Sequence, residues 1–270
     1  MDLSTKTYTE EELQRVEQLL APPEDGIYTP EYEQEIRQAF EIFTQKGIPV
    51  SLKDDLLNRF PLYSLEYELP EYEGIWEGLT YIDASFGFMS KLPHNISKLK
   101  NVEELHLRSN KIKALPPEIG ALGQLHTLNL FKNKLLSLPK EFGNLQNLKS
   151  LQLGGNQLNE LPKSFSLLHK LEYLALQNMK LELSEIPLEI FNLKSLQELV
   201  LNDNHIKSIP DEINQLQNLK TLSISDNQIN QFPEGLFALG QLERIYLGSN
   251  PVKPEEVIKL EKVFGDKVYW

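Results

Sequence analysis

Histidine is the side chain of this sequence best suited to acid–base or metal chemistry, because its charge changes near neutral pH and its neutral ring binds metal ions. The chain contains five histidines, which are His94, His106, His126, His169 and His205. They fall at different positions of a segment that repeats every 23 residues. Only His106 and His126, on neighbouring copies, could approach each other. Two imidazoles without a nearby carboxylate make a poor metal site, so we predict none.

Other catalytic arrangements are missing as well. The absence of cysteine excludes disulfides, thiolate zinc sites and cysteine nucleophiles. The chain has neither the Gly-x-Ser-x-Gly turn of serine hydrolases nor a glycine-rich nucleotide motif, and the Gly154-Gly155 pair does not form one. The adjacent Glu103 and Glu104 fall on opposite sides of a predicted strand. These absences predict a protein that is not an enzyme and binds no cofactor.

The pattern LxxLxLxxNxLxxLPxxIxxLxx fills most of the chain. Its copies start at residues 79, 102, 125, 148, 171, 196, 219 and 242, spaced by 23 residues except for 25 after residue 171. In a short strand, Leu105 and Leu107 point inward while Glu104 and His106 point outward. One unit cannot bury its own leucine face, so the units must stack and share a core. The bulkier LPxxIxxL segment returns on the other side and bends the stack, with the strands on its concave face.

An asparagine follows the strand in most units, namely Asn110, Asn133, Asn156, Asn204, Asn227 and Asn250. An amide both donates and accepts hydrogen bonds, so we interpret these residues as a ladder that joins the backbones of adjacent coils. The unit that starts at Leu171 has Met179 at the ladder position and two extra residues before Pro187. We predict a local adjustment there, with Asn178 or a water satisfying the turn and the extra residues bulging at the rim.

The repeated motif resembles that of the leucine-rich repeat family. Its 23-residue LPxxI form is similar to the repeats of intracellular Ras-scaffold proteins, plant Ras-group proteins and bacterial relatives. The resemblance covers residues 79–270. It implies an α/β leucine-rich repeat solenoid, curved, with a parallel sheet on its concave face. It also implies a protein-binding surface on that sheet and no shared chemistry.

A solenoid needs caps over its first and last coils. We therefore divide the chain into an acidic helical N-terminal cap region at 1–78, eight repeats at 79–250 and a C-terminal cap at 251–270. The rear segment predicts a helix from Pro254 that ends at Gly265, followed by a short strand.

The front segment predicts three helices. They begin after Thr9, after Thr29 and near Ser51, and Pro61 is expected to stop the third. Their apolar faces need partners, and the open edge of the first coil is available. A separately functioning module at 1–78 remains the alternative to a cap.

The net charge of −12 lies entirely in residues 1–78, where 18 Asp and Glu residues face 6 Lys and Arg residues. Nucleic acid would be repelled there and meets no basic stripe elsewhere, so we predict no nucleic-acid partner. Residues 61–79 interleave aromatic residues with five glutamates. The aromatic residues are Tyr63, Tyr67, Tyr72 and Trp76. They predict either a connecting hairpin or loop that covers the first coil, or an acidic-aromatic contact surface for a basic partner.

Aromatic and arginine side chains gather toward the front of the predicted concave face. Such side chains supply most of the binding energy in protein interfaces. The candidate partner-binding residues are Tyr81, Phe86, His106, Arg108, Asn129, Phe131, Gln152, Tyr173 and Gln177. Because Gly154 and Gly155 carry no side chains, we expect a dip beside this cluster that accepts a side chain of the partner.

The sequence therefore predicts a non-catalytic protein–protein interaction module, an adaptor or scaffold, that binds a protein partner on the concave sheet. One alternative is that the acidic N-terminal region binds a basic partner. The other is a carbohydrate or small-ligand receptor that uses the dip near Gly154-Gly155. No apolar run is long enough to span a membrane, and the N-terminus lacks the features of a signal peptide. We expect a cytoplasmic monomer, with export by another route left open.

Overall fold

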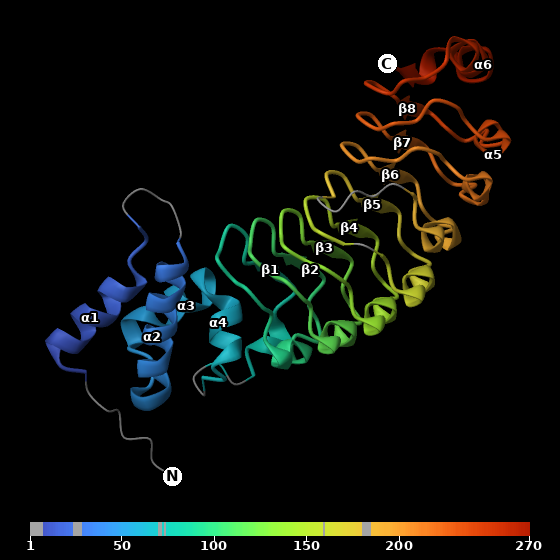
Figure 1. Cartoon of the computed structure of the whole chain (residues 1–270). Helices are drawn as coiled ribbons and strands as arrows, with labels where there is room; N and C mark the ends of the chain where they lie inside the picture. The colour runs from blue at the N-terminus through green and yellow to red at the C-terminus, as the bar shows by residue number, and fades with distance from the viewer. Residues whose placement is uncertain (1–7, 24–28, 70–71, 73, 159, 180–184) are drawn as a thin grey trace.

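The computed structural model describes residues 8–23, 29–69, 72, 74–158, 160–179 and 185–270. Within them, parallel strands form one sheet in which each strand pairs with the next along the chain. The strands are β1 Tyr81–Asp83, β2 Glu104–His106, β3 Thr127–Asn129, β4 Ser150–Gln152, β5 Tyr173–Ala175, β6 Glu198–Val200, β7 Thr221–Ser223, β8 Arg244–Tyr246 and β9 Val268–Tyr269. Figure 1 shows the sheet on the inner side of a curved stack, with short helices on the outer side. The predicted α/β solenoid is confirmed.

The register of the sheet follows the period of the sequence. Leu105 lies beside Leu128, 23 positions later, and Leu174 lies beside Leu199 across the longer unit. These central leucines are completely buried. Residues on either side of each central leucine therefore form columns that run across the concave face.

The returning segments form short helices that begin directly after the recurring proline. They are the 3-10 helices η4 His94–Lys98, η5 Pro117–Ala121, η6 Lys140–Asn144, η7 Lys163–Leu167, η8 Leu188–Asn192 and η9 Asp211–Gln215, and the α-helix α5 Glu234–Phe237. Each recurring proline stands at the N-cap of its helix, and Pro116, for example, is extended there with φ −70° and ψ 151°. Each helix buries an apolar side chain such as Ile119 or Phe142. A helix is wider than a strand, so the stack is longer on this outer side and curves.

The asparagine ladder has the predicted role. Asn133 accepts the backbone N–H of Ile112 at 3.1 Å with its Oδ1 and donates its Nδ2 to the carbonyls of Leu107 (2.8 Å) and Leu130 (3.0 Å). The side chain of Asn133 is buried. Each such amide therefore joins two adjacent coils and satisfies backbone groups that no strand partner reaches.

The irregular unit at Met179 keeps the ladder contact to the coil that follows it. The backbone N–H of Met179 donates to Oδ1 of Asn204 at 3.0 Å, and Nδ2 of Asn204 donates to Leu176 O at 2.9 Å. This is the contact that the amide of each following coil makes with the coil before it, as Asn133 does with Ile112. Asn178 has a left-handed φ of 53°, as do the equivalent residues of neighbouring coils, and Met179 is buried. The role of Asn178 or a water in this turn stays a prediction. The extra residues of this unit lie largely within 180–184, outside the described residues.

Helices at the front of the stack are α1 Glu10–Leu20, α2 Pro30–Lys46, η1 Val50–Leu52, α3 Lys53–Arg59, α4 Pro61–Glu66 and η3 Trp76–Gly78. The expected capping box at Thr9 is present, because its hydroxyl accepts the N–H of Glu12 while the Glu12 carboxylate accepts the N–H of Thr9. Pro61 follows the third helix as predicted but also begins α4, where a hairpin or loop was expected. A proline at the first helical position loses no hydrogen bond.

The buried apolar side chains of these helices, such as Phe40 and Leu65, join one continuous core with the repeats. At the other end, α6 Pro254–Phe264 and η10 Gly265–Lys267 lead into β9, as the sequence predicts. Gly265 ends α6 with a left-handed φ of 58°. The predicted boundaries between the N-terminal cap region, the repeats and the C-terminal cap, after residues 78 and 250, stay a prediction.

Candidate functional site

Three neighbouring coils place an arginine between two aromatic rings. The guanidinium of Arg108 lies 5.4 Å from the ring centroid of Phe86 and 5.3 Å from that of Phe131. All three residues follow the ends of strands β1, β2 and β3, so the sheet register sets their spacing. Arg108 and Phe86 are exposed and Phe131 is half-buried. The two rings hold the guanidinium in place while its edge stays open to a partner.

A second aromatic contact lies beside this stack. The rings of Tyr81 and His106 are 5.3 Å apart, and Nε2 of His106 lies 3.2 Å from a carboxylate oxygen of Glu104. Partial desolvation raises the pKa of Tyr81, and the carboxylates of Asp83 and Glu104 add to the effect. The front of the concave face therefore presents a neutral phenol, an imidazole and a guanidinium together.

The remaining predicted residues extend this cluster along the sheet. Asn129 accepts the backbone N–H of Phe131 at 3.0 Å, so its side chain holds the turn that orients Phe131. Gln152 and Tyr173 are half-buried on β4 and β5. Burial raises the pKa of Tyr173, and the carboxylate of Glu198 adds to this. The structure thus brings together the residues predicted on β1 to β5.

The predicted dip beside Gly154 and Gly155 is filled. A Cβ on Gly154 would stand 2.5 Å from Oε1 of Gln177, so the Gln177 side chain occupies this space. A Cβ on Gly155 would stand 3.1 Å from Cγ of Lys132. Both glycines are buried. The glycines make room for side chains of adjacent coils rather than for a ligand, so the prediction of a small-ligand dip is wrong.

The predicted acidic-aromatic contact surface is wrong for three of its four aromatic residues. Tyr63, Tyr72 and Trp76 are at most 6% exposed, and burial raises the pKa of Tyr63. Tyr72 packs against Trp76 with ring centroids 5.9 Å apart. These rings join the core that covers the first coil, which was the other interpretation of the segment.

A cavity that the sequence interpretation missed lies where the front helices meet the first coil. Its volume is about 260 Å³. Its lining combines residues of the front helices, such as Ile36, Arg59 and Phe60, with the loop of the first coil from Asp83 to Met89. The sequence contained a signal for it. Ala84 stands where the other units have Leu or Ile, and Gly87 stands at the asparagine position.

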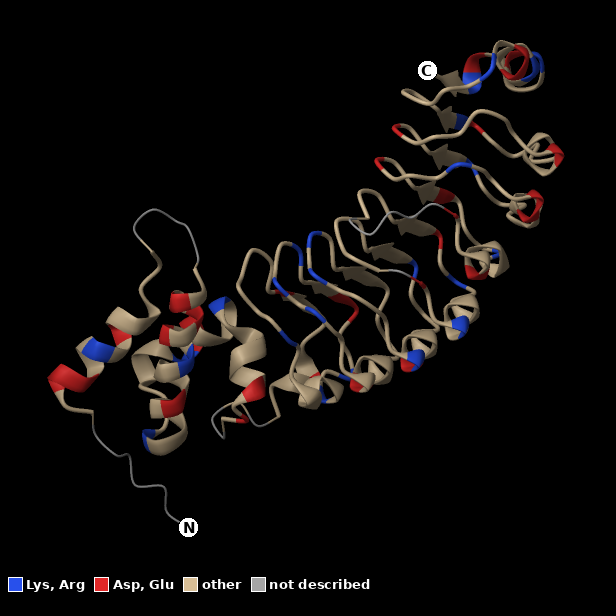
Figure 2. Ribbon diagram, viewed as in Figure 1, with Lys and Arg blue, Asp and Glu red and all other residues tan. Residues whose placement is uncertain are grey.

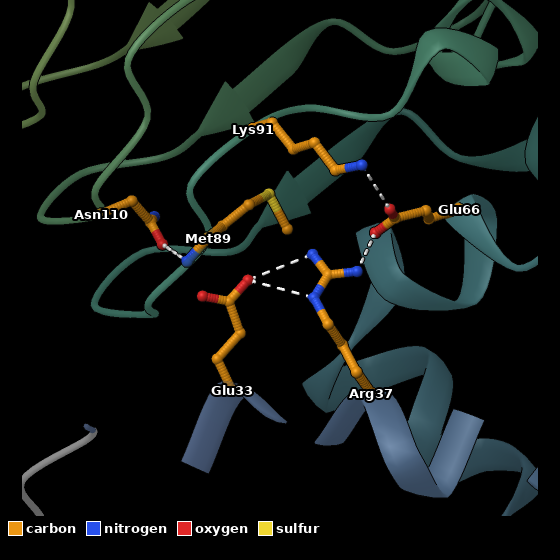
Figure 3. A network of polar contacts seen from close by, with 6 residues as sticks. All are labelled: Glu33, Arg37, Glu66, Met89, Lys91 and Asn110. Carbon is orange, nitrogen blue, oxygen red and sulfur yellow. Dashed lines mark hydrogen bonds and ion pairs between the residues drawn. The ribbon is translucent and has the colours of Figure 1, made fainter. Parts of the chain in front are cut away.

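A chain of ion pairs extends from Glu33, one of the residues that line this cavity (Figure 3). Arg37 pairs with Glu33 at 3.1 Å and with Glu66 at 3.0 Å, and Lys91 of the first coil lies 3.4 Å from Glu66. Asn110 accepts the N–H of Met89 at 3.1 Å. The contacts link α2, α4 and the first coil, so the cavity has a defined shape.

The histidines remain apart from any cluster of metal ligands. His126 lies 4.0 Å from Glu103, and His94 lies 3.2 Å from Glu118. The part of the chain that the structure describes holds no group of three or more His, Cys, Asp or Glu side chains placed to bind a metal. In the same part, no helix has the length and apolar character needed to cross a bilayer.

Known families match the repeats directly. Residues 119–203 match the leucine-rich repeat region family, and residues 186–252 match the leucine rich repeat family. The chain belongs to the leucine-rich repeat family. No curated protein matches this leucine-rich repeat chain.

Solved leucine-rich repeat structures resemble the chain over most of its length. A plant peptide hormone receptor, RGFR1 in complex with RGF2, is 32% identical with a TM-score of 0.58, over 70% of this chain and 32% of the receptor. The PEPR1–AtPEP1 structure is 27% identical with a TM-score of 0.55, over 68% of this chain and 27% of that one. The chain thus spans about a third or less of these two proteins. Internalin C2 from Listeria monocytogenes shares the fold at 21% identity and a TM-score of 0.57, over 72% of this chain and 80% of that one.

Proposed function

We propose that this leucine-rich repeat chain is a non-catalytic adaptor that binds a polypeptide partner on the front half of its concave face. The observation that carries the proposal is Arg108 held between Phe86 and Phe131. Ordering a long side chain costs free energy when a partner binds, and a side chain that is already held avoids much of that cost.

The family supports the same type of function. Leucine-rich repeat chains are generally interaction modules, and no enzyme family matches this one. One similar structure is a peptide hormone receptor in complex with RGF2, which favours a polypeptide as the ligand class here. The cytoplasmic location, the monomeric state and the absence of nucleic-acid binding stay predictions.

Paired alanine variants test the proposal. The double variant Arg108→Ala with Phe131→Ala removes both stacked side chains. The fold is expected to persist, because neither side chain is fully buried. Two hot-spot side chains together contribute about 3 kcal/mol or more, so the affinity for the partner should fall at least about a hundredfold. The measurement is affinity capture of partners by the wild-type and variant chains, followed by titration of the captured protein.

A matched control lies on the same sheet. Arg244 and Tyr246 on β8 are also an arginine and an aromatic residue in the outward columns. Arg244→Ala with Tyr246→Ala should leave capture unchanged. Capture that survives the front variant and is lost in this rear variant would contradict the proposal.

A further inference from the structure

Five cations gather beside the cavity at the front of the repeats. Arg108, Lys111, Lys113, Lys132 and Lys134 lie in the segments that follow β2 and β3. Figure 2 shows blue in these turns and red on the front helices. Lys111 is half-buried and the others are exposed. Among the described residues, none of the five has a carboxylate within ion-pair distance. We call these residues the basic patch. The sequence did not reveal the basic patch, because the repeats carry no net charge as a whole.

Two aromatic side chains connect the cavity to the basic patch. Phe86 and Phe88 both line the cavity. Phe86 stacks on Arg108, and Nζ of Lys111 lies 4.1 Å from the ring centroid of Phe88. A ligand in the cavity would therefore contact apolar walls and have cations within reach of its flanks.

The size of the cavity limits what enters it. Sites for drug-sized ligands span about 300–1,000 Å³, and this cavity of about 260 Å³ is smaller. Its polar lining is largely engaged, because Glu33 pairs with Arg37 and Arg59 pairs with Asp55 at 2.9 Å. Apolar walls such as Ile36 and Phe60 remain. The cavity thus suits one large apolar side chain better than a whole small molecule.

We propose that the cavity takes one large apolar side chain of the bound polypeptide, and that the basic patch binds acidic residues next to that side chain. This inference rests on the proposed function and names the partner chemistry. The cations of the basic patch form no ion pair with another described residue, so they complement acidic residues next to a large apolar side chain.

The loop of the first coil sets the direction of the acidic residues. Asp83 begins the cavity-lining loop and Met89 ends it. Lys111 donates its backbone N–H to Met89 O at 3.0 Å and Lys113 donates to Ser90 O at 3.3 Å, so these two lysines lie near the Met89 end. The acidic residues of the bound polypeptide are therefore expected on the Met89 side of its apolar side chain. The carboxylate of Asp83 disfavours acidic residues at the opposite end of the loop.

A long polyanion fits this surface poorly. The patch spans two coils, which is about 10 Å of sheet. The front helices beside it carry most of the excess negative charge of the chain. A nucleic acid that extended past the patch would meet this charge, whereas a short acidic peptide would not.

The test selects binders from a library of random linear peptides displayed on phage, with the full chain as bait. The expected consensus is one large apolar residue with two or more acidic residues on one side. A consensus that is basic, or that lacks an apolar position, overturns the proposal, as does a selection that yields no consensus. The best peptide is then synthesised with a fluorophore and titrated by anisotropy.

Two variants separate the two halves of the proposal. Ala84→Leu restores the side chain that the other units carry and fills the cavity. Lys111→Glu with Lys134→Glu reverses charge at exposed or half-exposed positions and leaves the cavity open. Each variant should lower the affinity for the selected peptide at least about tenfold. That is the loss expected when one buried apolar side chain or two charge contacts are removed. Raised salt should weaken the wild-type complex and have little effect on the charge-reversed one.

A charge-matched control and a concave-face variant complete the design. Lys207→Glu with Lys220→Glu changes the net charge equally, far from the cavity, and should retain binding. If Gln152→Ala with Tyr173→Ala abolishes binding while Ala84→Leu does not, the proposed function stands and the cavity site is overturned. If labelled single-stranded RNA binds the patch more tightly than the selected peptide, the acidic-polypeptide assignment is overturned as well.

Discussion

Glu68 and Lys98 join the front helices to the first repeat. Nζ of Lys98 donates to Oε1 of Glu68 at 2.8 Å, and Nδ2 of Asn95 reaches the same oxygen at 3.1 Å. Both partners belong to η4, whereas Glu68 lies just beyond α4. Asn95 also donates to Leu65 O at 2.6 Å. A small polar cluster thus spans the junction between the helical region and the solenoid.

This junction should make stability depend on pH. The hydrogen bond from Lys98, followed by that from Asn95, lowers the pKa of Glu68 below its ordinary value of 4.5. A lowered folded-state pKa means that the contribution to stability is present above pH 4.5 and is lost as the pH falls through the folded pKa. Glu68→Gln should therefore lower the urea midpoint at pH 7 and lower it less at pH 3. Because the side chain is exposed, the effect should be small.

The control for this prediction is Glu160→Gln, which changes an exposed glutamate away from the junction. Its urea midpoint should match that of the wild-type chain at both pH values. A Glu68→Gln effect that persisted unchanged at pH 3 would show that the ion pair does not cause it.

Removing residues 1–78 should expose the apolar edge of the first coil. Ile96 and Leu99 are completely buried in the intact chain, and α4 packs beside η4 (Figure 1). We expect the shortened chain to aggregate, because an exposed apolar edge of a repeat stack is unstable in water. The measurement is size-exclusion chromatography with light scattering. A monomeric, folded product would instead identify residues 1–78 as an independent module.

Phe86 occupies a backbone conformation that favours asparagine or glycine. Its φ is 60°, and the equivalent position of the next coil is Ser109 with φ 57°. A left-handed φ costs a residue with a bulky side chain about 1–2 kcal/mol, and an exposed cation–π contact returns about 0.5–1 kcal/mol. Phe86→Asn should therefore raise the free energy of unfolding by up to about 1.5 kcal/mol and weaken partner binding.

Urea unfolding and partner titration measure the two effects of Phe86→Asn separately. Ser109→Asn is the matched control, since it relieves the same backbone strain without removing a ring and should keep full affinity. A Phe86→Asn chain that is less stable, or that binds as well as the wild type, would contradict this explanation of the strained phenylalanine.

Removing one amide of the asparagine ladder should lower the free energy of unfolding. Asn156 is completely buried. Its amide accepts the N–H of Leu135 at 3.0 Å and donates to Leu130 O and Leu153 O. Asn156→Ala leaves buried backbone groups unsatisfied and should destabilise the chain by about 2–3 kcal/mol. Asn144→Ala, at an exposed position of η6, should change stability by less than about 0.5 kcal/mol. Equal urea midpoints for the two variants would refute the structural role of the ladder.

The repeats could be predicted from the sequence because their contacts recur at a fixed spacing. Leu105 and Leu128 occupy the same position of successive units, so one unit predicts the packing of the next. The unit at Met179 keeps this contact, because Asn204 of the following coil accepts the N–H of Met179. The filling of the space over Gly154 by Gln177 could not be predicted, since it depends on the length and rotamer of a side chain in the neighbouring coil.

The front of the molecule was less predictable. The cavity depends on how α2 and α4 meet the first coil, and no local pattern determines that contact. Ala84 and Gly87 were visible departures from the repeat, but their meaning required the position of Phe60 and Ile36 from the helices. The stacking of Arg108 between two rings was anticipated only as a cluster, because the rotamers that bring the side chains together are not set by sequence spacing.

The most direct test of the account is site-specific photo-crosslinking from the concave face. A photoreactive residue replaces Gln152, at the centre of the front cluster, or Arg244, in the outward columns of β8. After irradiation with bound partner, cross-linked products are mapped by mass spectrometry. The account predicts cross-links to the partner from position 152 and none from position 244. Cross-links from position 244 with none from position 152 would contradict it.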